Sequence, residues 1–156
     1  MPLRLERVVV NDELFMKEAL REAQKSIEKN EIPVGAVLVS GNKIISRGHN
    51  ESISRHDPSA HAEILAVREA CFLRCNYRLP DCELYVTLEP CAMCLGAAVH
   101  ARIKRLVFGA HDPKGGAVES IMNFPFEKTN HRIEIKGGVL AEECSRLLKG
   151  FFKDKR

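Results

Sequence analysis

The chain has 156 residues, of which 45% are hydrophobic and 29% are charged, and its formal net charge is +3. A chain of this length can bury a sizeable core, and nothing in its composition suggests a second domain. The net charge is too mild to define a partner by itself. We therefore expect one domain over residues 1–156.

The start of the chain and its cysteines bear on the cellular compartment. The first ten residues, MPLRLERVVV, hold a short apolar run broken by charges, unlike a signal peptide or a membrane-spanning segment. We expect a cytoplasmic protein with no membrane partner. An even cysteine count permits disulfides in a small secreted domain, but here free thiols or metal ligands are favoured. The six cysteines are Cys71, Cys75, Cys82, Cys91, Cys94 and Cys144.

The first predicted elements are a helix and a β-hairpin. Asn11 and Asp12 can cap a helix whose apolar residues recur at near-helical spacing, and charged residues end it near Asn30. Two short apolar runs then flank a Ser-Gly-Asn turn at residues 40–42, which is typical of a hairpin. We expect the helix to lie on the sheet that this hairpin begins.

A second helix is predicted to begin shortly after residue 57. Asp57 or Ser59 can cap it, and Pro58 suits its first position. His61 and Glu63 then lie in its first turns. Residues two positions apart do not share a helix face, so packing alone does not explain this pair.

The rest of the chain alternates between strands and helices. The predicted elements are a strand at 82–88, a helix at 89–101 opened by a proline, a strand at 102–109, a glycine-rich loop at 111–117, a short apolar segment near 121–126, a strand at 131–140 and a helix from Ala141. This alternation predicts an α/β fold with three α/β/α layers and a mixed sheet of about five strands.

The two internal helix openings carry residues with metal-ligand chemistry. His61 lies two positions before Glu63, and Pro90 directly precedes Cys91, which lies three positions before Cys94. A helix presents both cysteines on one side, and its N-terminus stabilises thiolates. One histidine and two thiolates make three ligands, the number that a catalytic zinc ion uses when water holds the fourth position. The spacing therefore predicts a catalytic zinc site.

Glu63 is the predicted proton carrier of this site. Two thiolates cancel the formal charge of a zinc ion, so its water needs a base beside it. Glu63 shares a helix opening with His61 and can take a proton from water and return it. Taken alone, the Cys-x-x-Cys pattern also fits a redox pair or core thiols, and the upstream His-x-Glu pattern favours zinc.

The remaining cysteines, histidines and cations have simpler interpretations. We expect the other cysteines to be buried apolar groups and the other histidines to be surface or hydrogen-bonded groups. These are Cys71, Cys75, Cys82 and Cys144, and His49, His56, His100, His111 and His131. The last eleven residues carry Arg146, Lys149, Lys153, Lys155 and Arg156 against Asp154. Such a basic helix end can contact phosphates, and a solvated helix end is equally compatible with it.

The His-x-Glu and Pro-Cys-x-x-Cys motifs form the zinc-deaminase signature. With the stretches around them, the chain resembles bacterial tRNA-specific adenosine deaminases of the TadA type over nearly its full length. Those stretches are IPVGAVLV, GHNESISRHDPSAHAEILA, LYVTLEPCAMCLGA, RLVFGAHDPKGGA, NHRIEI and GVLAEECSRLLKGFF. The zinc motifs define the superfamily, whereas TLEPC and GAHDPKGGA are similar to the tRNA-editing branch. The resemblance implies a cytidine deaminase-like fold.

The resemblance also implies an activity. It is the hydrolytic deamination of the wobble adenosine to inosine in a tRNA anticodon, with an arginine tRNA expected. His61, Cys91 and Cys94 would hold one zinc ion per subunit. Glu63 would move a proton from water to the purine N1 and then to the leaving amine.

The resemblance assigns further residues to the substrate. Asn50 would hydrogen-bond the flipped base, and Val34 would form an apolar wall against it. The Ala62 amide and the Pro90 carbonyl would lie close to the reacting centre, and Asp112 would meet the ribose beside the target. The family implies a homodimer whose loops meet the anticodon stem-loop.

Two other functions compete with this one. A deaminase of free guanine, cytosine or a nucleoside could keep the same zinc ligands. A zinc-stabilised RNA-binding module would need a fourth ligand, and the sequence offers no convincing one. The pair Phe151 and Phe152 is also open, because one ring could contact a base or both could pack in the core or a dimer interface.

Overall fold

The computed structural model of the protein describes residues 2–155, with side chains described from residue 12 onward. Its helices are α1 (Pro2–Glu28), α2 (Ala62–Arg74), α3 (Ala92–His100) and α4 (Ala141–Asp154), and a single 3-10 turn, η1, spans Phe126–Lys128. Its strands are β1 (Gly35–Ser40), β2 (Lys43–His49), β3 (Cys82–Leu88), β4 (Arg105–Ala110) and β5 (Glu134–Lys136). No helix in the described part of the chain is both long and apolar enough to span a bilayer.

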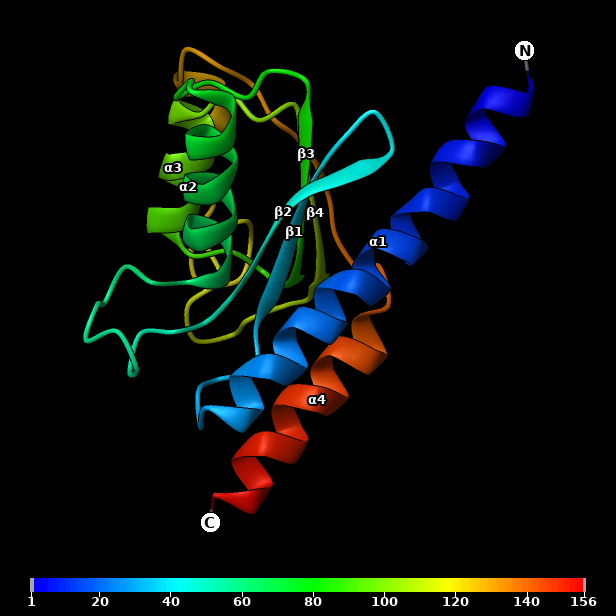
Figure 1. The fold of residues 1–156 in the computed structure, drawn as a ribbon. Helices are drawn as coiled ribbons and strands as arrows, with labels where there is room; N and C mark the ends of the chain where they lie inside the picture. The colour runs from blue at the N-terminus through cyan, green and yellow to red at the C-terminus, as the bar shows by residue number, and fades with distance from the viewer. Residues whose placement is uncertain (1, 156) are drawn as a thin grey trace.

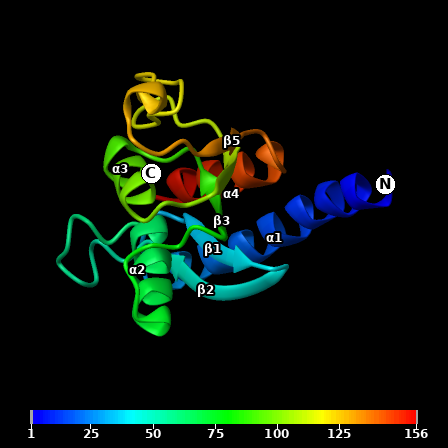
Figure 2. The same ribbon diagram turned by 90° about the horizontal axis from the view of Figure 1, so that it is seen from above.

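The five strands form one mixed sheet in the order β2-β1-β3-β4-β5. The first two pairings are antiparallel, whereas β3 with β4 and β4 with β5 are parallel. Helices α2 and α3 cover one face of the sheet, and α1 and α4 cover the other (Figures 1 and 2). The prediction of a three-layer α/β/α fold with a mixed sheet of about five strands is therefore confirmed.

The core consists of two layers because the middle strands are buried on both faces. Leu38 and Leu84 belong to the cluster under α2 and α3. Their neighbours Val37 and Tyr85 belong to the cluster under α1 and α4. This alternation follows from the two-residue period of a strand. All six residues of β4 are buried, because β4 lies between the parallel strands β3 and β5 and helices cover both faces of the sheet.

The hairpin between β1 and β2 forms as predicted. Gly41 and Asn42 have φ values of 56° and 64°, the left-handed conformation that both central residues of a type I′ turn require. Residues Gly35 and His49 pair at the other end of the hairpin. The turn and a β-bulge between Leu38 and Val39 together set which residues of β2 lie beside the start of β1.

The strand directions bring several loops to one edge of the sheet. Parallel strands β3 and β4 both end there, at Leu88 and Ala110. Because β1 is antiparallel to β3, its beginning lies at the same edge, and so does the end of β2. Ligands of open α/β sheets bind outside the carboxyl ends of the strands. This edge therefore collects the segments on which the predicted site residues lie.

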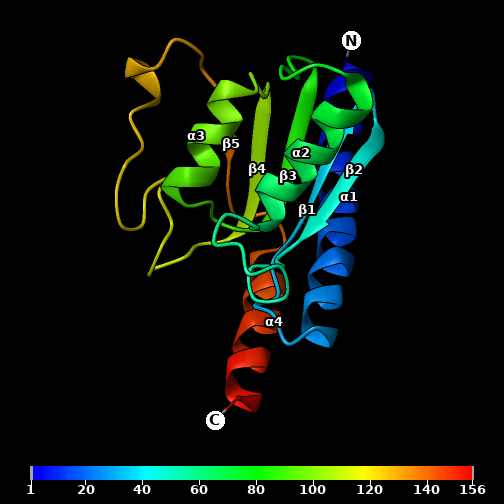
Figure 3. The same ribbon diagram turned by 60° about the vertical axis from the view of Figure 1, so that its left-hand side comes forward.

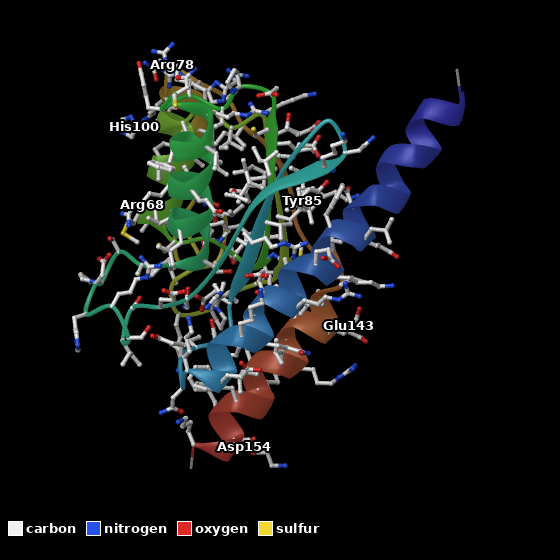
Figure 4. The ribbon with its side chains drawn as sticks, in the orientation of Figure 1. Arg68, Arg78, Tyr85, His100, Glu143 and Asp154 are labelled. Atoms are coloured by element: carbon white, nitrogen blue, oxygen red, sulfur yellow. The ribbon has the colours of Figure 1, made fainter. Side chains whose placement is uncertain are left out.

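The predicted start of the first helix is wrong. Helix α1 runs through the expected cap at Asn11 and Asp12, although its end near Asn30 is confirmed. Asp12 is 1% exposed, and its carboxylate accepts two hydrogen bonds from Arg105, at 2.6 and 2.8 Å. Figure 4 shows Tyr85 pointing from the sheet toward α1, and its hydroxyl donates to Asp12 at 2.8 Å. Asp12 therefore forms an ion pair with a distant residue instead of capping a helix. A capping rule considers only neighbouring residues and cannot predict such a pair.

Several other predicted boundaries also differ from the structure. Helix α2 begins at Ala62, not directly after residue 57. The apolar segment near 121–126 is irregular until the 3-10 turn, and the last strand is limited to three residues. In Figure 3 the chain between β4 and β5 passes around α3 as a long loop. Phe124 and Phe126 contact each other and pack against the core, whereas Ile121 and Met122 are exposed.

Candidate metal centre

Two of the three predicted metal ligands are helix N-caps at the edge of the sheet where β3 and β4 end, and the third, Cys94, lies in the first turn of α3. His61 is the N-cap of α2, and Cys91 is the N-cap of α3. The expected caps of α2, Asp57 and Ser59, instead bond to each other, since the Asp57 carboxylate accepts both the amide and the hydroxyl of Ser59. This turn precedes the helix. It leaves the N-cap to a residue whose side chain is free to face α3.

The three predicted ligands meet in one group. The Nδ1 atom of His61 lies 3.6 Å from the Cys91 sulfur and 3.5 Å from the Cys94 sulfur, and the two sulfurs lie 3.7 Å apart. Ordinary Zn–N and Zn–S bonds at tetrahedral angles place such donors ~3.6 Å (N to S) and ~3.8 Å (S to S) apart. The donor set and its spacing therefore fit a zinc ion. Within residues 12–155, His61, Cys91 and Cys94 are the group of three His, Cys, Asp or Glu side chains whose donor atoms lie close enough to hold one ion.

The three ligands shift one another's pKa values because they share protons within the group. Hydrogen bonds from the Cys94 thiol and from His61 lower the pKa of Cys91 to about 4 against the effect of burial. The contact with Cys91 raises the pKa of His61, and it also raises the pKa of Cys94. A bound cation would replace the shared protons, because thiolate and neutral imidazole are the metal-binding forms.

Glu63 lies beside the group in the first turn of α2. Its side chain is buried, and burial raises the pKa of its carboxyl group, with the charge of His61 acting in the opposite direction. A raised pKa makes a carboxyl group better able to accept a proton and then return it. Glu63 thus lies in the first turn of α2, as the sequence predicts.

Val34, Asn50 and Ala62 are joined by hydrogen bonds at the N-terminus of α2. The Asn50 amide donates to the Val34 carbonyl at 3.1 Å, and the Ala62 amide donates to Oδ1 of Asn50 at 2.9 Å. The Asn50 side chain therefore completes the N-terminus of α2. Its orientation leaves the carboxamide nitrogen as the group that can meet a ligand.

Pro90 and Asp112 lie on two segments that contact each other. The Pro90 carbonyl accepts the Ala117 amide at 2.8 Å. Pro90 precedes the N-cap of α3, so the predicted start of this helix at residue 89 is wrong. The Asp112 amide donates to the buried carboxylate of Glu89 at 3.1 Å. Sequence reasoning gave Glu89 no role, although its charge next to a buried strand end was a signal.

The basic end of α4 lies near Asp112. Arg146, Lys149 and Lys153 line an open groove together with His111. Phe152 is 47% exposed and lines a neighbouring apolar pocket of about 450 Å³ with Asp112. The core interpretation of the Phe152 ring is therefore wrong. Arg156 of the predicted basic end lies outside the described residues.

The other cysteines and histidines mostly follow the predictions. All six cysteines are free thiols. Cys82 and Cys144 are buried as expected, whereas Cys71 is half-buried. Cys75 is exposed at the C-cap of α2, where it has a left-handed conformation with φ of 52°. Its predicted burial is wrong. Among the histidines, His131 contacts the Ile103 carbonyl at 2.8 Å, in keeping with a hydrogen-bonded role.

Comparison with known proteins gives consistent matches. The MafB19-like deaminase family matches residues 10–156. The tRNA-specific adenosine deaminase of Bacillus subtilis (strain 168) is 49% identical over 149 residues, which cover 95% of this chain and 92% of that protein. The protein of the same name from Haemophilus influenzae is 54% identical over 147 residues, which cover 93% of this chain and 85% of that one.

Solved structures match as well. A structure from studies of A-to-I editing by tRNA:A34 deaminases superposes with a TM-score of 0.82 at 46% identity, covering 86% of this chain and 98% of that one. A guanine deaminase from Nitrosomonas europaea superposes with a TM-score of 0.77 at 25% identity, covering 89% of this chain and 83% of that one.

The layered fold, the His-Cys-Cys group and these matches define the class: the chain belongs to the MafB19-like deaminase family. Within that class it belongs to the tRNA-specific adenosine deaminases, whose curated members match it over more than nine-tenths of its length.

Proposed function

We propose that the protein hydrolyses the 6-amino group of the wobble adenosine in a tRNA anticodon loop, producing inosine and ammonia. One observation carries the chemistry. His61, Cys91 and Cys94 present three donor atoms at the spacing of a tetrahedral zinc shell, beside the buried carboxyl group of Glu63. The close similarity to tRNA-specific adenosine deaminases supports the substrate.

These three side chains would hold one zinc ion per chain. When bound, the ion would supply the Lewis acid that lowers the pKa of the attacking water. Glu63 takes the proton of that water and delivers it to the purine N1 while the oxygen attacks C6. Glu63 then takes the remaining proton from the hydroxyl group added at C6 and passes it to the amino group, which leaves as ammonia when the C6–N bond breaks, while N1 keeps the first proton.

The target base must leave its stack to reach this centre. A single-stranded anticodon loop makes that step cheaper than a duplex does. We assign the Asn50 carboxamide to the edge of the flipped base and the buried Val34 side chain to its wall. The Pro90 carbonyl and the Ala62 amide border the reacting centre, and Asp112 meets the ribose of the neighbouring nucleotide.

The groove on α4 suits the RNA backbone. Arg146, Lys149 and Lys153 line it, next to the loop that carries Asp112. Cations arranged along a helix can neutralise successive phosphates. We assign this groove to the anticodon stem-loop of the tRNA, and we expect an arginine tRNA, a homodimer and a cytoplasmic location.

Deamination of a free purine such as guanine is the second candidate. It is favoured by the superposition on the guanine deaminase of Nitrosomonas europaea. The two candidates share the metal centre and differ in the substrate. We would therefore incubate the protein with an ACG-anticodon tRNA and separately with free guanine, adenosine and cytidine. Inosine confined to the wobble position supports the proposal, whereas ammonia from a free base without edited tRNA refutes it.

The role of Glu63 is tested by Glu63→Gln. The substitution keeps the size of the side chain and removes its capacity to carry the proton. We expect bound zinc and tRNA affinity to be retained and turnover to fall by roughly 10²–10⁴-fold. Cys75→Ser is the matched control, because Cys75 is exposed at the far end of α2. Unchanged turnover in Glu63→Gln would exclude Glu63 from proton transfer.

A further inference from the structure

Glu89 joins the metal-bearing end of α3 to the loop that follows β4. Its side chain is 2% exposed, and it lies two positions before Cys91. Both carboxylate oxygens accept hydrogen bonds from the loop. The donors are the amides of Asp112 at 3.1 Å, Val118 at 3.0 Å, Glu119 at 2.9 Å and Ser120 at 3.1 Å, together with the Ser120 hydroxyl.

These amides belong to a segment without helix or strand structure. Residues 111–120 form no ladder that could satisfy their amides, so a buried anion takes the place of secondary structure. A second attachment lies beside the first, where the Ala117 amide donates to the Pro90 carbonyl at 2.8 Å. The loop is therefore attached to the two residues that directly precede a metal ligand.

Gly116 shows how closely the loop wraps around the carboxylate. A Cβ atom at this position would lie 2.3 Å from the Glu89 carboxyl carbon and 2.4 Å from one of its oxygens. Such distances are far inside van der Waals contact. Only glycine lets the backbone pass the anion, so the loop conformation and Glu89 depend on each other.

We propose that Glu89 is a positioning residue that orders residues 112–120 and so presents Asp112 to the nucleotide beside the target adenosine. The part of this inference that concerns the nucleotide depends on the proposed function. Glu89 is not a proton carrier, because both of its oxygens are already held by amide donors. It acts on the substrate through the loop, and the metal ligands remain independent of it.

The test is Glu89→Gln in the zinc-loaded protein. Glutamine has nearly the same shape, but it loses the charge and turns an NH2 group toward amide donors. We expect one zinc ion per chain to be retained, and KM for an anticodon stem-loop to rise at least ~10-fold while kcat changes less than ~3-fold. Hydrogen exchange of the amides between 112 and 120 should accelerate at least ~10-fold.

Two further variants separate positioning from loss of stability. Gly116→Ala leaves Glu89 intact but displaces the loop from it, and it should reproduce the same KM effect. Glu89→Asp keeps the charge and should recover part of the affinity. Asp12→Asn removes another buried carboxylate, on the opposite face of the sheet, and should lower stability without changing KM.

Each outcome of the Glu89→Gln experiment either supports or contradicts the positioning role of Glu89. A rise in KM with fast exchange confined to the loop supports the inference. Loss of zinc from Glu89→Gln would show that Glu89 holds the metal ligands instead, and unchanged exchange with unchanged KM would show that the loop is ordered without it. If the wild-type protein leaves the stem-loop unedited, the proposed function fails, and the exchange comparison alone decides whether Glu89 orders the loop.

Discussion

Asp12→Asn probes the buried ion pair between α1 and the sheet. The Asp12 carboxylate lies between Arg105, Tyr85 and Lys136, which all donate to it at 2.6–3.0 Å. Burial by itself would raise the pKa of Asp12, but the hydrogen bonds from these three partners outweigh burial and hold the pKa at about 2. Asparagine keeps the shape of the side chain and removes the charge that Arg105 needs.

The magnitude follows from the difference between the folded and unfolded pKa. A decrease from 3.8 to about 2 corresponds to about 2 kcal/mol of stability at neutral pH. Because the folded pKa is the lower one, this contribution is fully present above pH 3.8 and is lost as the pH falls toward 2. Leaving Arg105 buried without its partner adds to the cost at neutral pH.

The assay is urea unfolding of wild type and Asp12→Asn at several pH values between 7 and 2.5. The gap between the two free energies of unfolding should be at least about 2 kcal/mol at pH 7 and should narrow below pH 4. Loss of any bound metal at low pH affects both proteins alike. Glu13→Gln, at an exposed neighbouring position of α1, is the control. A gap that is absent at pH 7, or that stays constant to pH 2.5, would refute this reasoning.

Three further outcomes are expected. Lys149→Ala with Lys153→Ala should weaken tRNA binding and reduce the slope of log K against log salt by about 2, whereas Lys43→Ala at the hairpin turn should leave the slope unchanged. Gly35→Ala should lower the melting temperature strongly, because its Cβ would lie 2.0 Å from a carbonyl oxygen of α1, whereas Gly150→Ala, with open space around it, should not. A zinc chelator should abolish ammonia release, and added Zn²⁺ should restore it.

The fold was predictable because hydrophobic patterning repeats along whole elements. The strand over 82–88 and the hairpin turn at Gly41 and Asn42 follow from local sequence, and the structure has them where they were expected. Element ends were less predictable. Asp12 and Asp57 both satisfy the local rule for a helix cap, yet one pairs with a distant arginine and the other bonds within its own turn. A capping rule reads only neighbouring residues and cannot weigh such partners.

The same distinction separates the parts of the site that the sequence predicts from those that it does not. A metal ligand must be one of a few side chains, so His61, Cys91 and Cys94 keep a recognisable type and spacing. The partners of Glu89 are mainly backbone amides, which any residue except proline supplies, and they lie 23 to 31 positions away. The sequence shows a glutamate at position 89, but it does not show that this side chain binds the amides of residues 112–120. Residues that perform chemistry leave a pattern of side-chain types, whereas a residue that orders a loop is identified by the geometry of the folded chain.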